Sequence, residues 1–143
     1  MGEVVDLQRY REKTLERRAF YTWRKRFGET FTCNTHLGDI SGETLFWLAG
    51  PGEKSAGAYY ELIFGALSLG KSNDLRFIDK DQQLRVIDLH LFLADQVRFE
   101  MMRRIGWISS YPCQAYPLID LVMKFESVKK NSRGLYPHLS ETH

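Results

Sequence analysis

The sequence has few cysteines and no long apolar run. Its two cysteines, Cys33 and Cys113, stand eighty positions apart, which favours two reduced thiols in a cytoplasmic protein over a disulfide scaffold. The longest apolar stretch, Ala58 to Leu69, holds twelve residues with Glu61 inside it, too short to span a bilayer. The first six residues lack the basic and apolar segments of a signal peptide, so we expect neither export nor a membrane partner.

A large excess of charge is also missing from the chain as a whole. Twenty Lys and Arg residues against eighteen Asp and Glu residues leave a formal net charge of +2, which alone does not indicate a polyanionic partner. Hydrophobic residues make up 43% of the 143 residues and charged residues 27%, so the composition excludes a disordered chain. This length suits one helical domain spanning residues 1–143, and we expect flexible ends at residues 1–6 and 135–143.

Hydrophobic residues recur at helical spacing along most of the chain. Helices are predicted at residues 7–27, 42–49, 54–69, 79–105 and 117–129, from this spacing and from the capping residues, prolines and glycines that flank them. The fourth helix has apolar residues on nearly every side, so we expect it to be mostly buried. The predicted fold class is therefore all-α: a compact single-domain bundle of about five helices packed around a long fourth helix, residues 79–105.

One residue of the third predicted helix indicates how that helix packs. Gly65 stands in the helix interior, where glycine costs about 1 kcal/mol relative to alanine. Close approach of a neighbouring backbone is the expected compensation.

The first predicted helix has two apolar faces. Leu7, Tyr10 and Tyr21 share one face, whereas Ala19 and Trp23 lie on another. One small domain offers one core, so the second face predicts a second surface to contact. A protein partner, including a second copy of the chain in a homodimer, would supply it.

The same helix is strongly basic. Residues 7–27 carry eight Lys or Arg residues and two Glu residues, a local balance of +6. Rows of cations suit phosphate binding, and Tyr21 and Trp23 would be able to stack on bases. The alternative is a solvated helix whose arginine stems cover apolar neighbours. The candidate contacts with an anion or a nucleic acid are Arg11, Lys13, Arg17, Arg18, Arg24 and Lys25.

Metal binding and cysteine chemistry find little support. Cys33 and His36 have the spacing of a metal-binding pair, but no second close pair completes a site. The isolated residues that would have to complete it are His90, Cys113, His138 and His143. Cys113 would be a nucleophile if a histidine and Asp120 assisted it, but no catalytic motif surrounds this cysteine. We therefore predict no metal, no cofactor and no catalytic residue.

Two aspartates of the fourth predicted helix form a further candidate site. Asp88 and Asp95 lie seven residues apart and share one helical face, with Arg85 one turn before the first and Arg98 one turn after the second. On a buried helix these four residues would form buried ion pairs. Together with His90, the two aspartates would instead form a metal or enzyme site.

These features lead to three functional hypotheses. The first is a small helical protein without enzymatic activity that binds another protein or itself. The second is a nucleic-acid-binding or regulatory protein that uses the basic first helix. The third is a metal protein or enzyme with its site around Asp88, His90 and Asp95, and it ranks last because these residues lack a companion motif.

Overall fold

The computed structural model describes residues 2–70 and 73–135, with side chains described for 7–70 and 73–130. These residues form helices without any strand, so the predicted all-α class is confirmed. The predicted flexible end at 135–143 lies almost entirely outside the described residues. The α-helices are α1 (Gly2–Phe27), α2 (Gly42–Ala49), α3 (Glu53–Leu67), α4 (Lys80–Arg104), α5 (Leu118–Met123) and α6 (Phe125–Leu135), and the short 3₁₀ helices are η1 (Leu37–Asp39) and η2 (Leu75–Phe77).

Local signals set most helix boundaries. Ser41 caps α2 by accepting a hydrogen bond from the Thr44 backbone N–H, and Asp79 caps α4 in the same way through Gln82. Gly28 ends α1 in the left-handed region, at φ 66°. The start of α1 differs from the expectation because the helix continues through Asp6 back to Gly2.

The last predicted helix, residues 117–129, is divided in the structure. Lys124 interrupts it with φ −115° and ψ 29°, so α5 ends at Met123 and α6 continues to Leu135. No glycine or proline stands at this break, which is why the sequence shows one helix there.

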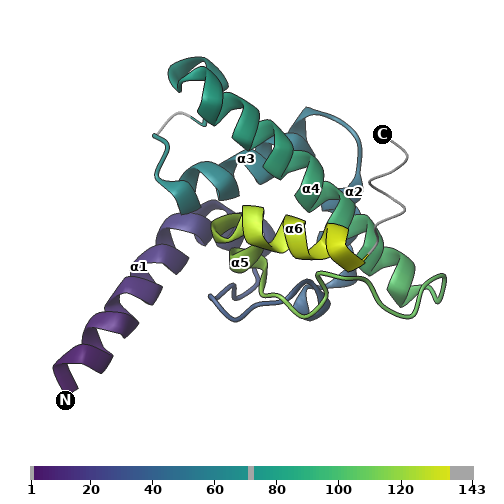
Figure 1. Cartoon of the computed structure of the whole chain (residues 1–143), viewed down its shortest axis with the longest axis horizontal. Helices are drawn as coiled ribbons and strands as arrows, with labels where there is room; N and C mark the ends of the chain where they lie inside the picture. The colour runs from purple at the N-terminus through teal and green to yellow at the C-terminus, as the bar shows by residue number, and fades with distance from the viewer. Residues whose placement is uncertain (1, 71–72, 136–143) are drawn as a thin grey trace.

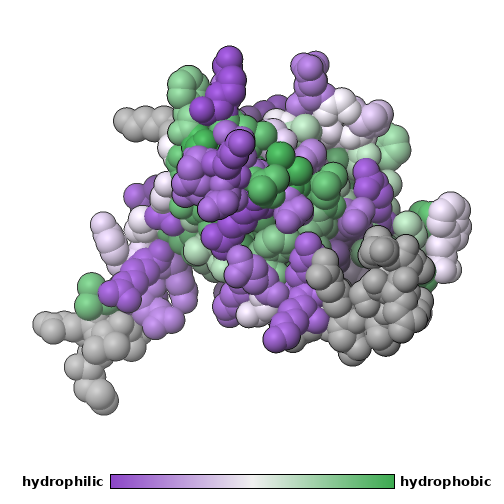
Figure 2. Space-filling model, turned by 45° about the horizontal axis from the view of Figure 1, so that its top comes forward, coloured by the Kyte–Doolittle hydropathy of each residue, from purple (hydrophilic) through white to green (hydrophobic). Residues whose placement is uncertain are grey.

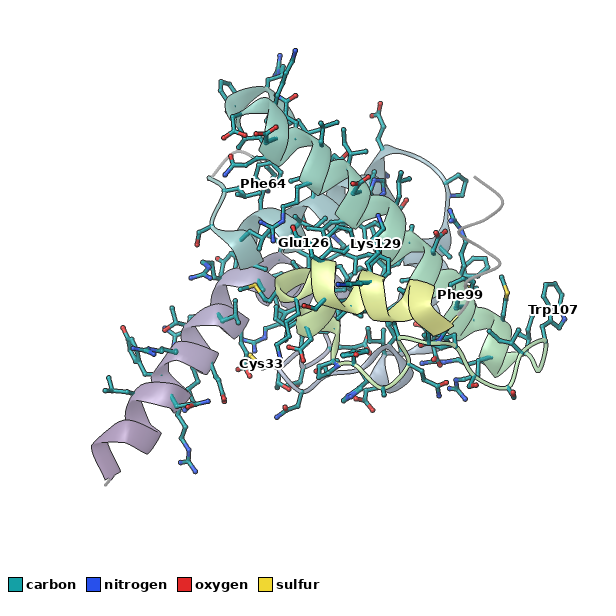
Figure 3. The ribbon with its side chains drawn as sticks, viewed as in Figure 1. Cys33, Phe64, Phe99, Trp107, Glu126 and Lys129 are labelled. Carbon is teal, nitrogen blue, oxygen red and sulfur yellow. The ribbon has the colours of Figure 1, made fainter. Side chains whose placement is uncertain are left out.

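Helix α3 contacts more elements than any other helix, since α1, α2, α4 and α5 all pack against it (Figure 1). Leu62 and Phe64 of this helix are buried in the core (Figure 3). By contrast, α4 buries only the stripe that faces α2 and α3, which includes Leu89 and Leu93. Leu84 and Leu91 on its other side are exposed. The expected burial of α4 on nearly all sides is therefore wrong, because α6 covers only part of its outer side, where the rings of Phe92 and Phe125 meet with centroids 5.3 Å apart.

The backbones of α1 and α3 meet at Gly65, as the sequence predicted. A Cβ atom at this position would overlap the carbonyl oxygen of Arg18 and would lie 3.3 Å from the Cα of Ala19. The Arg18 side chain donates hydrogen bonds to the carbonyl oxygens of Gly65 and Ala66, at 2.7 and 2.9 Å. Further along the crossing, the Trp23 indole N–H donates to the carbonyl oxygen of Ala58 at 2.8 Å. The two helices therefore run antiparallel in direct backbone contact.

Aromatic rings fix the inner end of α1. Phe20, Trp23 and Phe27 of this helix pack against Phe31 of the following loop, with ring centroids 5.3 to 6.4 Å apart. Phe27 also meets Trp47 of α2 edge to face at 5.3 Å. Such ring pairs contribute beyond their buried area, so the second half of α1 is firmly attached to the body.

A buried carboxylate joins the end of α4 to two loops. Glu100 is fully buried and accepts hydrogen bonds from Arg103, Arg104 and the hydroxyl of Tyr111, at distances from 2.6 to 3.1 Å. Burial by itself would raise the pKa of Glu100, but these hydrogen bonds outweigh it and lower the pKa to about 2. The same Arg104 guanidinium also donates to the carbonyl oxygens of Leu37, Gly38 and Ile40.

Replacing Gly65 with alanine is expected to lower the free energy of unfolding by about 2–3 kcal/mol, because the new Cβ would force the helices apart. Gly57→Ala in the same helix is the matched control. No atom lies within 4 Å of a Cβ at Gly57, so alanine should raise the free energy of unfolding by up to about 1 kcal/mol. Urea unfolding followed by circular dichroism measures both, and equal effects would contradict the close contact.

Replacing Glu100 with glutamine is expected to lower the free energy of unfolding at pH 7 by about 3 kcal/mol, because the folded carboxylate has a pKa of about 2 against an ordinary value of 4.5. A carboxyl group whose pKa is lower in the folded state stabilises the protein at pH values above its unfolded-state pKa. This stabilisation is lost as the pH falls towards the folded-state pKa. Stability of the parent should therefore drop between about pH 5 and pH 2, and the variant should show a smaller drop.

The control for the Glu100 variant is Asp95→Asn, which removes one carboxylate from an exposed ion pair. It should change the free energy of unfolding by less than about 1 kcal/mol. Unfolding midpoints measured between about pH 5 and pH 2 test both variants. A Glu100→Gln protein with the parent's acid sensitivity would show that another group controls it.

Candidate nucleic-acid interface

The outer half of α1 extends away from the body of the molecule (Figure 1). Residues 7–14 are all exposed, whereas Ala19, Phe20 and Trp23 farther along the helix are buried. Leu7 is 56% exposed and Tyr10 is 70% exposed. The two predicted apolar faces thus have different environments: the inner face joins the core, whereas the outer face is largely exposed and meets the body at a shallow pocket that Met123 of α5 also lines. Trp23, predicted as a stacking platform for bases, belongs to the core, so that prediction is wrong.

Three of the six candidate cations have internal partners. Arg18 binds the carbonyl oxygens at the crossing with α3. Arg24 donates to the carbonyl oxygen of Phe31 at 2.6 Å and lies 3.9 Å from the Glu16 carboxylate. The Lys25 ammonium is 2.6 Å from the hydroxyl of Tyr21 and 4.3 Å from the centroid of its ring. Arg18 and Arg24 therefore attach α1 to α3 and to the following loop, whereas the contact between Lys25 and Tyr21 lies within α1.

The other three candidates, Arg11, Lys13 and Arg17, are exposed and form no hydrogen bond or ion pair with the described residues. Arg9, which the sequence reasoning left out of the candidate set, has the same environment. Glu16 does not neutralise them, because its carboxylate turns inward and accepts a hydrogen bond from the Cys33 backbone N–H at 2.8 Å. Arg9, Arg11, Lys13 and Arg17 thus form no ion pair with a described residue, although Glu12 stands among them in the sequence.

These cations flank a neutral row on the exposed side of the helix. At about 100° per residue, Tyr10, Thr14 and Tyr21 lie along one line. Arg11 and Lys13 lie about 80° to either side of that line. The Thr14 hydroxyl donates to the carbonyl oxygen of Tyr10 at 2.7 Å. The Tyr10 hydroxyl has no partner among the described residues, so it remains able to donate and to accept.

The outer face of α1 continues onto α5. A shallow pocket at this junction is lined by Tyr10, Arg11, Arg18 and Met123, together with Thr14 and Leu15. In the view of Figure 2 the extending part of the chain is mainly hydrophilic, whereas hydrophobic side chains gather on the body. Cationic and neutral side chains of α1 therefore form one continuous polar surface, which we call the α1 face: Tyr10, Arg11, Lys13, Thr14, Arg17, Arg18 and Tyr21.

The four residues predicted as buried ion pairs lie at the surface. Asp95 is paired with Arg98 at 3.1 Å, but the two side chains are 58% and 56% exposed. Asp88 is exposed, and Arg85 lies 4.0 Å from Glu126 of α6 instead. The predicted burial is wrong because these residues stand on the side of α4 that faces away from α2 and α3. The buried carboxylate of this helix is Glu100, which the sequence reasoning missed.

His90 does not join the two aspartates. Its ring packs against those of Tyr59 and Tyr60, with centroids 5.2 and 5.3 Å away. Burial, with a smaller contribution from the charge of Arg98, lowers the pKa of His90. The described residues contain no group of three or more His, Cys, Asp or Glu side chains that would hold a metal ion. The proposed site around Asp88, His90 and Asp95 therefore does not assemble.

The cysteine and histidine candidates also occupy structural positions. Burial, assisted by the nearby Glu16 carboxylate, raises the pKa of Cys33 to about 11, which makes its thiol a poor nucleophile near neutral pH. The ring nitrogens of His36 lie 2.8 and 3.1 Å from the carbonyl oxygens of Asn34 and Ala115. Cys113 is buried, and the other two predicted ligands, His138 and His143, lie outside the described residues.

Comparison with known proteins finds no matching family model, no similar curated protein and no matching solved structure. Within residues 2–70 and 73–135, none of the helices combines the length and the apolar character needed to cross a bilayer. The α1 face is therefore the feature of the described residues from which we infer a function.

Proposed function

We propose that this chain binds a nucleic acid through the α1 face. The observation that supports this proposal is a set of exposed cations, unpaired among the described residues, on a helix that extends from the body: Arg11, Lys13 and Arg17. Positive charge is also segregated in the chain. Helix α1 (Gly2–Phe27) carries eight Lys or Arg residues and four Asp or Glu residues, a balance of +4 within a chain whose net charge is +2, so the remaining residues sum to −2. Charge gathered on one element directs a polyanion to that element.

The spacing of the free cations supports a binding role over a purely structural one. Arg9, Lys13 and Arg17 follow one another at intervals of four residues, and like charges at this spacing destabilise a helix by about 0.2–0.5 kcal/mol per pair. The outer half of α1 gains no compensation from burial. Phosphate groups would remove this repulsion and release condensed counterions from the nucleic acid.

An acidic protein is the second candidate partner. Leu7 and Tyr10 are apolar and largely exposed on the outer half of α1, and they would be buried against a partner helix that has acidic flanks. Pairing of two α1 helices from separate copies would bring like charges together. Self-association therefore stays a prediction, and the α1 face gives it less support than it gives an anionic partner.

The triple substitution Arg11→Gln, Lys13→Gln and Arg17→Gln is expected to weaken binding to mixed-sequence DNA by at least about tenfold. It should also lower the slope of log K against log salt by about 2–3, since each lost phosphate contact lowers it by about 0.9. Fluorescence anisotropy with labelled DNA over a series of salt concentrations measures both quantities.

The matched control is Lys54→Gln, Lys80→Gln and Lys130→Gln, which removes the same charge from exposed positions outside α1. This control should keep the parental slope. Equal losses in the two triple variants would show that only total charge matters. A parent protein that binds no DNA, while an acidic peptide helix binds, would favour the second candidate.

A further inference from the structure

We infer, on the basis of the function proposed above, that the nucleic acid is a B-form DNA duplex whose major groove receives the outer half of α1. The width of an α-helix such as α1 matches the width of this groove. An α-helix with its side chains is about 10–12 Å across, and the major groove of B-form DNA is about 12 Å wide. The deep, narrow major groove of A-form RNA does not admit such a helix.

The outer half of α1 is also accessible to a DNA groove. A helix can enter a groove only where its own protein leaves it uncovered on several sides. Residues 7–14 are exposed without exception, and this segment extends from the body (Figure 1). Its eight residues correspond to roughly 12 Å of helix, and the major groove is about 8.5 Å deep. The body therefore leaves room for the groove to reach this part of α1.

The arrangement of positive charge on α1 also suits a duplex. A helix in the major groove has a phosphate strand on each side and base edges in front. Arg11 lies on one side of the α1 face, and Lys13 and Arg17 lie on the other, with Tyr10 between them. Two cationic flanks separated by a neutral row match the two phosphate strands of a duplex better than they match a single phosphate strand. The Tyr10 hydroxyl, which has no partner in the described part of the chain, is the group positioned to contact base edges.

A single strand fits this surface less well. Proteins that bind single strands present several aromatic rings on which successive bases stack. On α1, Trp23 is buried, and the ring of Tyr21 is already covered by the Lys25 ammonium at 4.3 Å. Tyr10 is left as the one uncovered ring on the described part of this helix face. Trp107 is also exposed, but it projects from the turn after α4, at the end of the molecule opposite α1 (Figure 3).

The test compares three probes of the same mixed sequence and of about two helical turns: duplex DNA, duplex RNA and single-stranded DNA. The full-length parent is expected to bind duplex DNA at least about tenfold more tightly than either of the other probes. Methylation of guanine N7, which lies in the major groove, should interfere with binding. Methylation of adenine N3, in the minor groove, should not.

Two single variants test the role of Tyr10. Tyr10→Ala is expected to weaken binding to duplex DNA by at least about threefold, whereas Trp107→Ala, which removes an aromatic ring that is 75% exposed elsewhere, should leave it unchanged. Both side chains lie at the surface, so neither variant should alter the unfolding midpoint.

The outcomes separate this inference from the proposed function. Equal binding to all three probes, a preference for RNA or a single strand, or interference from the minor groove alone would overturn the duplex assignment while leaving nucleic-acid binding in place. An equal loss in Tyr10→Ala and Trp107→Ala would also overturn it. Failure to bind any of the three probes would overturn the proposed function as well.

Discussion

The position of α1 depends on the backbone contact between Arg18 and Gly65. Because Gly65 has no Cβ, α3 approaches the backbone of α1 more closely than side chains would allow. This contact lies well past the middle of the 26-residue helix. The residues that follow it turn Phe20 and Trp23 into the core. The residues that precede Leu15 have few contacts with the body: the Cys33 thiol donates to the carbonyl oxygen of Glu12 at 3.6 Å, and Met123 of α5 lines a shallow pocket with Tyr10 and Arg11. The outer half of α1 therefore extends from the body beyond its crossing with α3 (Figure 1).

The same crossing divides the cations of α1 into two groups. Arg18, Arg24 and Arg26 lie near the crossing or beyond it, where carbonyl oxygens of α3 and of the following loop, or the Glu61 carboxylate, accept their hydrogen bonds. Arg11 and Lys13 lie before it and have no such partner among the described residues. Sequence alone did not separate the groups, because Arg17 and Arg18 are neighbours in one helical run. The rotation of about 100° around the helix axis between successive residues places the Arg17 side chain in solvent and the Arg18 side chain against α3.

Local signals made much of the fold predictable, whereas long-range contacts did not. The Ser41 and Asp79 caps, the all-α class and the close approach at Gly65 followed from short patterns. Glu100 was missed because two arginines three and four residues later look like an ordinary surface arrangement. What buries its carboxylate is the Tyr111 hydroxyl and the neighbouring loop that contains η1. Conversely, Asp88 and Asp95 were placed inside because Leu84 and Leu91 suggested a buried side of α4, and these leucines are exposed.

The outer half of α1 is therefore a helix maintained mainly by its continuation from the docked half. An isolated helix of this length is marginal in water, and the run of Arg9, Lys13 and Arg17 adds repulsion between successive turns. A bound polyanion would remove that repulsion and would place negative charge beside the positively polarised start of the helix. Under the proposed function, binding and the helical stability of this segment would be thermodynamically linked: a ligand that neutralises the α1 face would also favour the conformation that presents it.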